Sequence, residues 1–94
     1  MAGSYKPPKH SQIKVTEQKL RKAKAQVDHP SYKRIELKID PRQNKLMKLD
    51  ALCHELIHLF DWDLPEGKVR KMATYIAKGL WKEGYRKSVK FDKK

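Results

Sequence analysis

The chain has 94 residues and a formal net charge of +12, the balance of 23 basic and 11 acidic side chains. A chain this short forms a single domain with a small hydrophobic core, which excludes a multidomain architecture. Its one cysteine excludes an internal disulfide, and the lack of a run of about 20 apolar residues excludes a transmembrane helix. With no apolar leader at the N-terminus, these features favour a cytoplasmic protein.

The excess of positive charge favours anionic partners, such as nucleic acid or acidic proteins, without indicating a fold. Basic residues occur near the N-terminus, between residues 19 and 24, and from Lys82 to the C-terminus. No known nucleic-acid-binding motif accompanies them, so an ordinary solvated surface explains the charge as well as a nucleic-acid patch does. The sequence leaves the oligomeric state open.

Composition divides the chain into three parts. Residues 1–11 are rich in Gly, Ser, Pro and charged side chains, which predicts a flexible N-terminal arm. Residues 12–86 are predicted to form the domain. Residues 87–94 form a predicted basic tail.

A sheet of three short strands is predicted before residue 40. Residues 13–15 and 34–39 alternate apolar and polar side chains, the period-two pattern of half-buried strands. Residues 23–27 alternate more weakly, and the turn chemistry of residues 28–31 would join them to the 34–39 strand as a hairpin. The composition of residues 16–26 also suits a helix. We favour a strand there, because it gives a small antiparallel sheet its third member.

Two helices are predicted after a turn at Asp40-Pro41. The first lies near residues 43–60, where apolar side chains recur at helical spacing. The second follows the short loop at residues 61–64 and ends at Gly84, which is placed as a C′ glycine. So short a loop makes antiparallel neighbours of the two helices, and together they can cover one face of the sheet. The predicted fold class is α+β.

The second helix has a candidate capping box, in which Asp63 caps the helix and Glu66 follows three residues later. Pro65 would then lie in the first turn, where its missing N–H costs nothing. The apolar side chains expected to face the core are Leu46, Leu49, Leu52, Cys53, Leu56, Leu59 and Phe60 in the first helix, and Val69, Met72, Ala73, Ile76 and Leu80 in the second.

The most specific motif is the HExxH run His54-Glu55-Leu56-Ile57-His58. Because His54 and His58 are four residues apart on a helix, both rings lie on one side and can bind the same Zn²⁺. Glu55 points away from them, where it can accept a proton from the water that completes the zinc coordination. The motif therefore predicts a catalytic zinc site. The alternative is a helix that carries two histidines beside its core.

A catalytic zinc site needs a third protein ligand, and no histidine follows His58. The carboxylates that follow the motif are Asp61, Asp63 and Glu66. Glu66 is preferred, because antiparallel packing returns the start of the second helix to the level of His58, although its place in the capping box competes with this role. Neither His10, in the arm, nor His29, in a turn, is well placed.

Cys53 lies about 100° around the helix from His54, so it is expected in the core rather than on the metal. A hydrolase also needs a hydrogen-bond donor for the developing oxyanion. Tyr75, Tyr85 and Arg86 are candidates, and the sequence does not choose among them.

These residues resemble the small HExxH proteins common in bacteriophages, which belong with the zincin-like metallopeptidases. The similarity covers roughly the C-terminal two-thirds of the chain, with a weaker match at residues 25–28, where such proteins have a hairpin. The matching positions are residues 34–39, 54–58, Glu66, Val69, Ala73, Ile76, Ala77, Leu80, Trp81, Gly84, Tyr85 and Arg86. The resemblance implies a minimal zincin fold: a small antiparallel sheet, a zinc helix and a following helix that supplies an acidic ligand. Glu66 matches the first of two acidic positions, and Gly67 stands at the second.

We therefore expect a small zinc-dependent metallopeptidase acting on a peptide or protein substrate. In it His54, His58 and Glu66 bind Zn²⁺, and Glu55 activates the zinc-bound water. The alternative is a basic nucleic-acid- or protein-binding module in which any zinc is structural. A third reading is a metal-free scaffold whose histidines are incidental.

Overall fold

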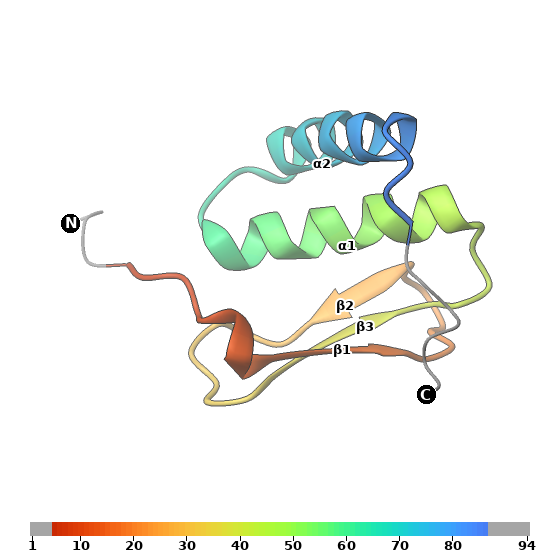
Figure 1. The fold of residues 1–94 in the computed structure, drawn as a ribbon. Helices are drawn as coiled ribbons and strands as arrows, with labels where there is room; N and C mark the ends of the chain where they lie inside the picture. The colour runs from red at the N-terminus through yellow and green to blue at the C-terminus, as the bar shows by residue number, and fades with distance from the viewer. Residues whose placement is uncertain (1–4, 87–94) are drawn as a thin grey trace.

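The computed structural model describes residues 5–86. Along the chain they form η2 (His10–Gln12), β1 (Ile13–Glu17), β2 (Ala25–Val27), β3 (Ile35–Ile39), α1 (Lys45–Phe60) and α2 (Glu66–Lys82), where η2 is a single 3₁₀ turn. Figure 1 shows the three strands on one side, α1 above them and α2 on the outer side of α1. The predicted α+β class, with three strands and two helices, is confirmed. Neither described helix combines the length and the apolar character needed to cross a membrane.

The three strands form a mixed sheet in the order β1-β3-β2. β2 pairs antiparallel with β3, as the predicted hairpin requires, and residues 16–26 contain no helix. β1 pairs parallel with β3, with Ile13 opposite Ile35 and Val15 opposite Leu37. The prediction of a wholly antiparallel sheet is therefore wrong for this pair.

The parallel pairing follows from the central place of β3. Its three apolar side chains are all buried, and a strand buried in this way needs a partner on both edges for its backbone groups. The chain reverses between β1 and β2, so these two strands run in opposite directions. Because β3 lies between them and is antiparallel to β2, it is parallel to β1.

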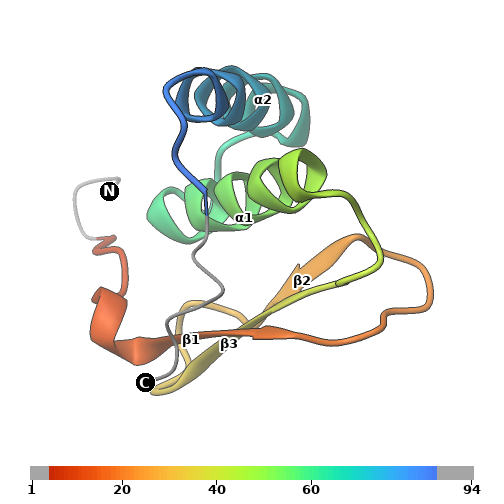
Figure 2. The same ribbon diagram turned by 45° about the vertical axis from the view of Figure 1, so that its right-hand side comes forward.

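The hydrophobic core has two parts, which lie on opposite sides of α1. The sheet-side cluster contains Ile35, Leu37, Ile39 and Leu59, flanked by Ile13, Ala25, Val27, Leu52, Leu56 and Trp62. The α2-side cluster contains Cys53, Ala73 and Ala77, flanked by Leu49, Ile57 and Leu80. In both views α1 therefore lies between the sheet and α2 (Figure 2), whereas we expected both helices to cover the sheet side by side.

Three apolar side chains that we expected in the core are exposed: Phe60 by 70%, Met72 by 38% and Ile76 by 41%. The buried residues of α2 are instead Val69, Ala73 and Ala77. Small alanine side chains let two helix axes approach closely, so the contact with α1 forms along the alanines and turns the larger side chains outward.

The start of α2 differs from the predicted cap, whereas its C-terminal end agrees with the prediction. α1 begins after Asn44, whose side chain accepts a hydrogen bond from a backbone N–H three residues on, a cap that we did not identify from the sequence. α2 begins at Glu66, with Pro65 as its N-cap residue and no side-chain cap. The predicted cap by Asp63 is therefore wrong, because the helix begins too late for it. The predicted C′ glycine is confirmed: Gly84 has φ 87° and closes a Schellman motif.

The chain from Tyr5 to β1 lies against the C-terminal end of α1. The Tyr5 hydroxyl donates a hydrogen bond to the carbonyl of Leu59. Pro7 and Pro8 line a hollow together with Phe60. The remainder of the predicted arm, residues 1–4, and the predicted basic tail, residues 87–94, lie outside the described residues.

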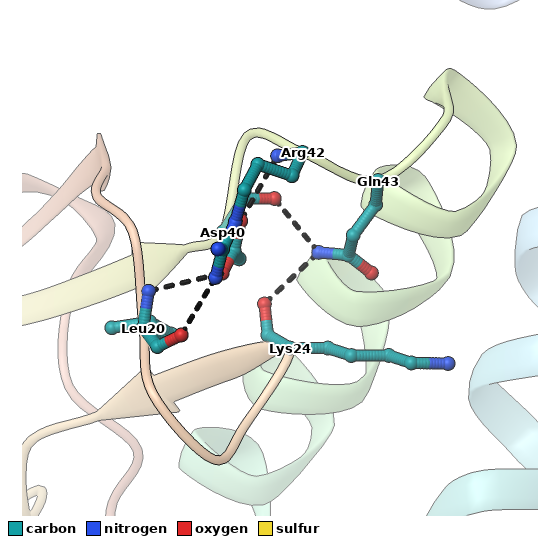
Figure 3. Close-up of polar contacts among 5 residues, drawn as sticks. All are labelled: Leu20, Lys24, Asp40, Arg42 and Gln43. Atoms are coloured by element: carbon teal, nitrogen blue, oxygen red, sulfur yellow. Dashed lines mark hydrogen bonds and ion pairs between the residues drawn. The ribbon is translucent and has the colours of Figure 1, made fainter.

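Asp40, at the end of β3, is the one buried charged side chain among the described residues. Its carboxylate accepts hydrogen bonds from the backbone N–H of Leu20 and from the backbone and guanidinium of Arg42 (Figure 3). Arg42 also donates to the Leu20 carbonyl, and Gln43 donates to the carbonyls of Lys24 and Asp40. These bonds tie the β1–β2 loop to the segment that leads into α1. The hydrogen bonds from Arg42, and then from Leu20, hold the pKa of Asp40 well below its usual value.

Replacing Asp40 with Asn should lower the stability at neutral pH and flatten its dependence on acid. A carboxylate whose pKa is lowered by folding stabilises the folded state above its unfolded pKa of about 4, and this contribution is lost as the pH falls toward the folded pKa. The urea midpoint of the wild type should therefore fall below about pH 5, whereas that of Asp40→Asn should start lower and change less. The exposed Asp63→Asn is the control, and an acid profile unchanged by Asp40→Asn would contradict this role.

Candidate metal centre

Three side chains from the two helices meet at one point. His54 and His58 lie one turn apart on α1, and Glu66 is the first residue of α2. Oε2 of Glu66 is 3.0 Å from Nε2 of His54, and Oε1 of Glu66 is 2.9 Å from Nε2 of His58. The two Nε2 atoms are themselves 3.2 Å apart. One carboxylate thus spans both imidazoles of the HExxH motif.

The chain reversal between the helices brings Glu66 to the histidines. The backbone N–H of Asp61 donates to the last turn of α1 and ends the helix, and α2 begins five residues later. Farther from this loop, the Thr74 hydroxyl donates to the carboxylate of Asp50. The contacts of α1 with α2 therefore run in opposite order along the two helices, which is the order expected of antiparallel neighbours (Figure 1).

Glu66 is available to the histidines because it takes no part in a capping box. Within residues 5–86, one group of three or more potential metal ligands has its ligand atoms within 4.8 Å of one another, and it consists of His54, His58 and Glu66. The other two carboxylates considered from the sequence, Asp61 and Asp63, lie outside this group. Hence Glu66, the preferred candidate, is the one that the fold brings to the histidines.

The arrangement suits a cation. A proton can bridge two of the three converging side chains, whereas a metal ion can be bonded by all three. The histidine side chains are about one-fifth exposed and that of Glu66 is 52% exposed, so an ion could enter from the surface. The cluster can hold a metal ion.

Arg70 is a neighbour of this cluster that we did not identify from the sequence. Its Nη2 is 3.3 Å from Oε2 of Glu66. The i,i+4 spacing of Glu66 and Arg70 on α2 could have predicted this ion pair from the sequence. Partial burial by itself would raise the pKa of Glu66, but the hydrogen bond with His58 and the charges of His54, His58 and Arg70 lower it.

Glu55 is half-buried beside His54. Burial raises the pKa of Glu55, the neighbouring His54 and His58 oppose this shift, and the charge of Glu66 adds to it. A carboxyl group whose pKa is raised toward neutrality is better suited to accept and then donate a proton in a reaction.

Two open hollows flank the cluster, and Glu55 lines both. The first, which we call the His58 hollow, has a volume of about 560 Å³ and is lined by Gln26, Val27, Asp28, Glu36, Lys38, Glu55, His58 and Trp62. The second, the His54 hollow, has a volume of about 590 Å³ and is lined mainly by residues 22–25, Met47, Asp50, Ala51, His54, Glu55, Glu66, Arg70 and Thr74. Both hollows border β2 or the residues next to it. β2 is an edge strand, so one of its edges has no partner strand in the sheet.

The other histidines lie outside the ligand group. The ring of His29 is 4.9 Å from that of Trp62, which in turn is 6.2 Å from the ring of His58. His29 therefore contacts Trp62, which lines the His58 hollow, and no sequence pattern indicated this contact. His10 lies in η2, where it borders a different hollow, formed by the N-terminal residues and the end of α1.

The three candidate oxyanion donors and Cys53 can also be located in the structure. Tyr75 is 82% exposed and Tyr85 is 66% exposed, and the Arg86 guanidinium lies 3.3 Å from the centre of the Trp81 ring. None of the three candidate oxyanion donors is among the residues that line the two hollows. Cys53 is buried in the α2-side cluster, as predicted, and burial together with the nearby Asp50 raises the pKa of its thiol.

Comparison with protein-family models, with curated proteins and with solved structures finds no match. The resemblance to bacteriophage HExxH proteins therefore stays a prediction, and function must be argued from the site.

Metal binding should stabilise the protein through these three side chains. At a free metal concentration about 100 times its Kd, one bound ion adds about 2.7 kcal/mol to the free energy of unfolding. We expect elemental mass spectrometry to find one Zn²⁺ per chain, and thermal unfolding to show the added stability. Both effects should be lost in His58→Ala and Glu66→Ala but kept in the control His29→Ala. Full zinc content in Glu66→Ala would remove Glu66 from the ligand set.

Proposed function

We propose that this protein is a zinc-dependent peptidase in which His54, His58 and Glu66 bind Zn²⁺ and Glu55 is the general base. The main support is the convergence of these three side chains, with contacts of 2.9–3.2 Å between them, beside a half-buried carboxylate that borders both hollows. Two imidazoles and one carboxylate form a ligand set known from catalytic zinc sites, which leave one position for water or substrate.

The short spacing of the ligand atoms is compatible with zinc. With zinc–ligand bonds of about 2.0–2.1 Å, the corners of a tetrahedron lie about 3.3 Å apart. In the structure the two imidazole nitrogens are 3.2 Å apart, and each lies 2.9–3.0 Å from a different oxygen of Glu66, so small side-chain movements would bring one carboxylate oxygen and both nitrogens onto one ion. Ca²⁺ prefers six or more oxygen ligands at longer distances, which a site with two nitrogens does not supply.

Each part of the site would have its own role in peptide hydrolysis. Zn²⁺, when bound, would polarise the carbonyl and make water a better nucleophile at neutral pH. Glu55 accepts a proton from the attacking water and can return it to the leaving amine. Arg70, at the rim of the His54 hollow, is the cationic side chain closest to the ligands and is better placed to contact a substrate than Tyr75, Tyr85 or Arg86.

An extended peptide is the substrate class that the surface favours. The two hollows lie on either side of Glu55, so side chains on both sides of a scissile bond would find space. The free edge of β2 offers unpaired backbone groups, with which an extended peptide can form β-sheet hydrogen bonds. The bacteriophage origin and the cytoplasmic location remain predictions from the sequence.

A binding module with a structural zinc is the second candidate. It is favoured by the net charge of +12, whereas the three ligands and the exposed Glu66 are less typical of a structural site, which usually holds four protein ligands in an enclosed setting. In that case Glu55 would be dispensable, because it is not a ligand.

Replacing Glu55 with Gln should separate the two candidates. The amide cannot accept the proton, so hydrolysis of a quenched fluorescent peptide library should fall by about 10²–10⁴-fold while zinc content stays at the wild-type level. Glu83→Gln, an exposed glutamate after α2, is the matched control. Cleavage by Glu55→Gln at the wild-type rate would exclude the proposed mechanism. Zinc-loaded wild type that cleaves no member of the library would favour the structural role.

A further inference from the structure

The outer side of α2 carries a regular line of basic side chains, the α2 lysine face, formed by Lys68, Lys71, Tyr75, Lys78 and Lys82. All five residues are exposed. Their steps of three or four residues keep them within an arc of about 80° around the helix and along about 21 Å of its length. The buried residues Val69, Ala73 and Ala77 lie on the opposite side, against α1.

The charge of this face is not neutralised by the protein. No lysine of the face forms an ion pair within residues 5–86, whereas Lys48 pairs with Glu17 and Lys38 with Glu36. Glu66 is the single acidic residue of α2, and its carboxylate is held by the histidines. Four positive charges therefore follow one line on the surface, with spacings that suit the phosphates of a polyanion.

Tyr75 lies at the centre of the lysine face, and it is the most exposed of the large apolar and aromatic side chains among the described residues, at 82%. A ring this exposed contributes little to the core. An aromatic ring flanked by lysines is the arrangement that binds single-stranded nucleic acid, since a base stacks on the ring and the lysines contact the phosphates.

We propose that the α2 lysine face binds single-stranded nucleic acid, with Tyr75 as the stacking residue and the four lysines as phosphate contacts. A membrane surface fits less well, because an interfacial helix buries a wide apolar side in lipid, and α2 uses its apolar side on α1. Met72 and Ile76, which border the face, are 38% and 41% exposed and form only a narrow apolar strip. Binding here needs no metal and leaves both hollows open.

The test is fluorescence anisotropy of labelled oligothymidylate with the full chain, over a series of salt concentrations. We compare wild type with the quadruple variant Lys68→Gln, Lys71→Gln, Lys78→Gln and Lys82→Gln. The control replaces four exposed lysines outside the face, with the same loss of charge: Lys6→Gln, Lys14→Gln, Lys33→Gln and Lys45→Gln. Circular dichroism and zinc content check that each variant is folded.

For wild type, the logarithm of the binding constant should fall linearly with the logarithm of salt concentration. Loss of four phosphate contacts should make this slope shallower by about 3 in the quadruple variant, and by much less in the control. Tyr75→Ala should weaken binding by about 5- to 150-fold and leave the slope unchanged.

Three results would overturn the assignment. Equal losses in the two quadruple variants would mean that net charge alone attracts the oligonucleotide. Unchanged affinity in Tyr75→Ala, or equal affinity for the matching duplex, would exclude stacking on an unpaired base. Binding of the wild type to phosphatidylserine vesicles but not to oligothymidylate would assign the face to a membrane. Each result is independent of peptidase activity.

Discussion

The arrangement of the whole molecule depends on α1, which is packed on two sides at once. At about 100° per residue, a helix of this length presents separate sides to separate neighbours. Leu52, Leu56 and Leu59 face the sheet; Leu49, Cys53 and Ile57 face α2; and His54 and His58 occupy the side that remains. A rotation of α1 that exposed the histidines would withdraw the leucines from β3. The apolar packing of the helix therefore fixes the direction of the two imidazoles that could hold a metal ion, and it does so without any bond to a metal.

The cluster also requires a fixed distance between the two helices, because its third side chain, Glu66, belongs to α2. Glu66 reaches both imidazoles only if α2 approaches α1 closely, and the contact of Cys53 with Ala73 and Ala77 allows this approach. Larger side chains at the alanine positions would move the axes apart and with them the carboxylate. α2 thus has three roles along one helix: its first residue completes the ligand cluster, its alanines set the separation from α1, and its opposite side presents lysines to the solvent.

Periodicity alone predicted much of this structure. The alternation at residues 34–39 identified β3 and its buried side, and the HExxH spacing placed two histidines on one side of a helix that the structure contains. Alternation shows which side of a strand is buried but not which strand lies beside it, so it could not reveal the parallel pairing of β1 with β3. Helical spacing likewise predicted Met72 and Ile76 on the buried side of α2, whereas the structure buries Ala77 and leaves these two side chains 38% and 41% exposed. The position of Glu66 depended on where α2 begins, which caps predict within a few residues at best.

The parallel pairing of β1 also has a consequence for the order in which the chain folds. The β2–β3 hairpin and the α1–α2 pair each form between neighbouring segments, whereas β1 can dock only after β3, which lies beyond β2 in the chain, has been formed. Contacts between distant segments carry a larger loop-closure cost and usually form later. The two histidines and Glu66 belong entirely to the local α1–α2 pair. A metal ion could therefore be captured early, while the far edge of the sheet is still open, and could then hold the helices together as β1 arrives.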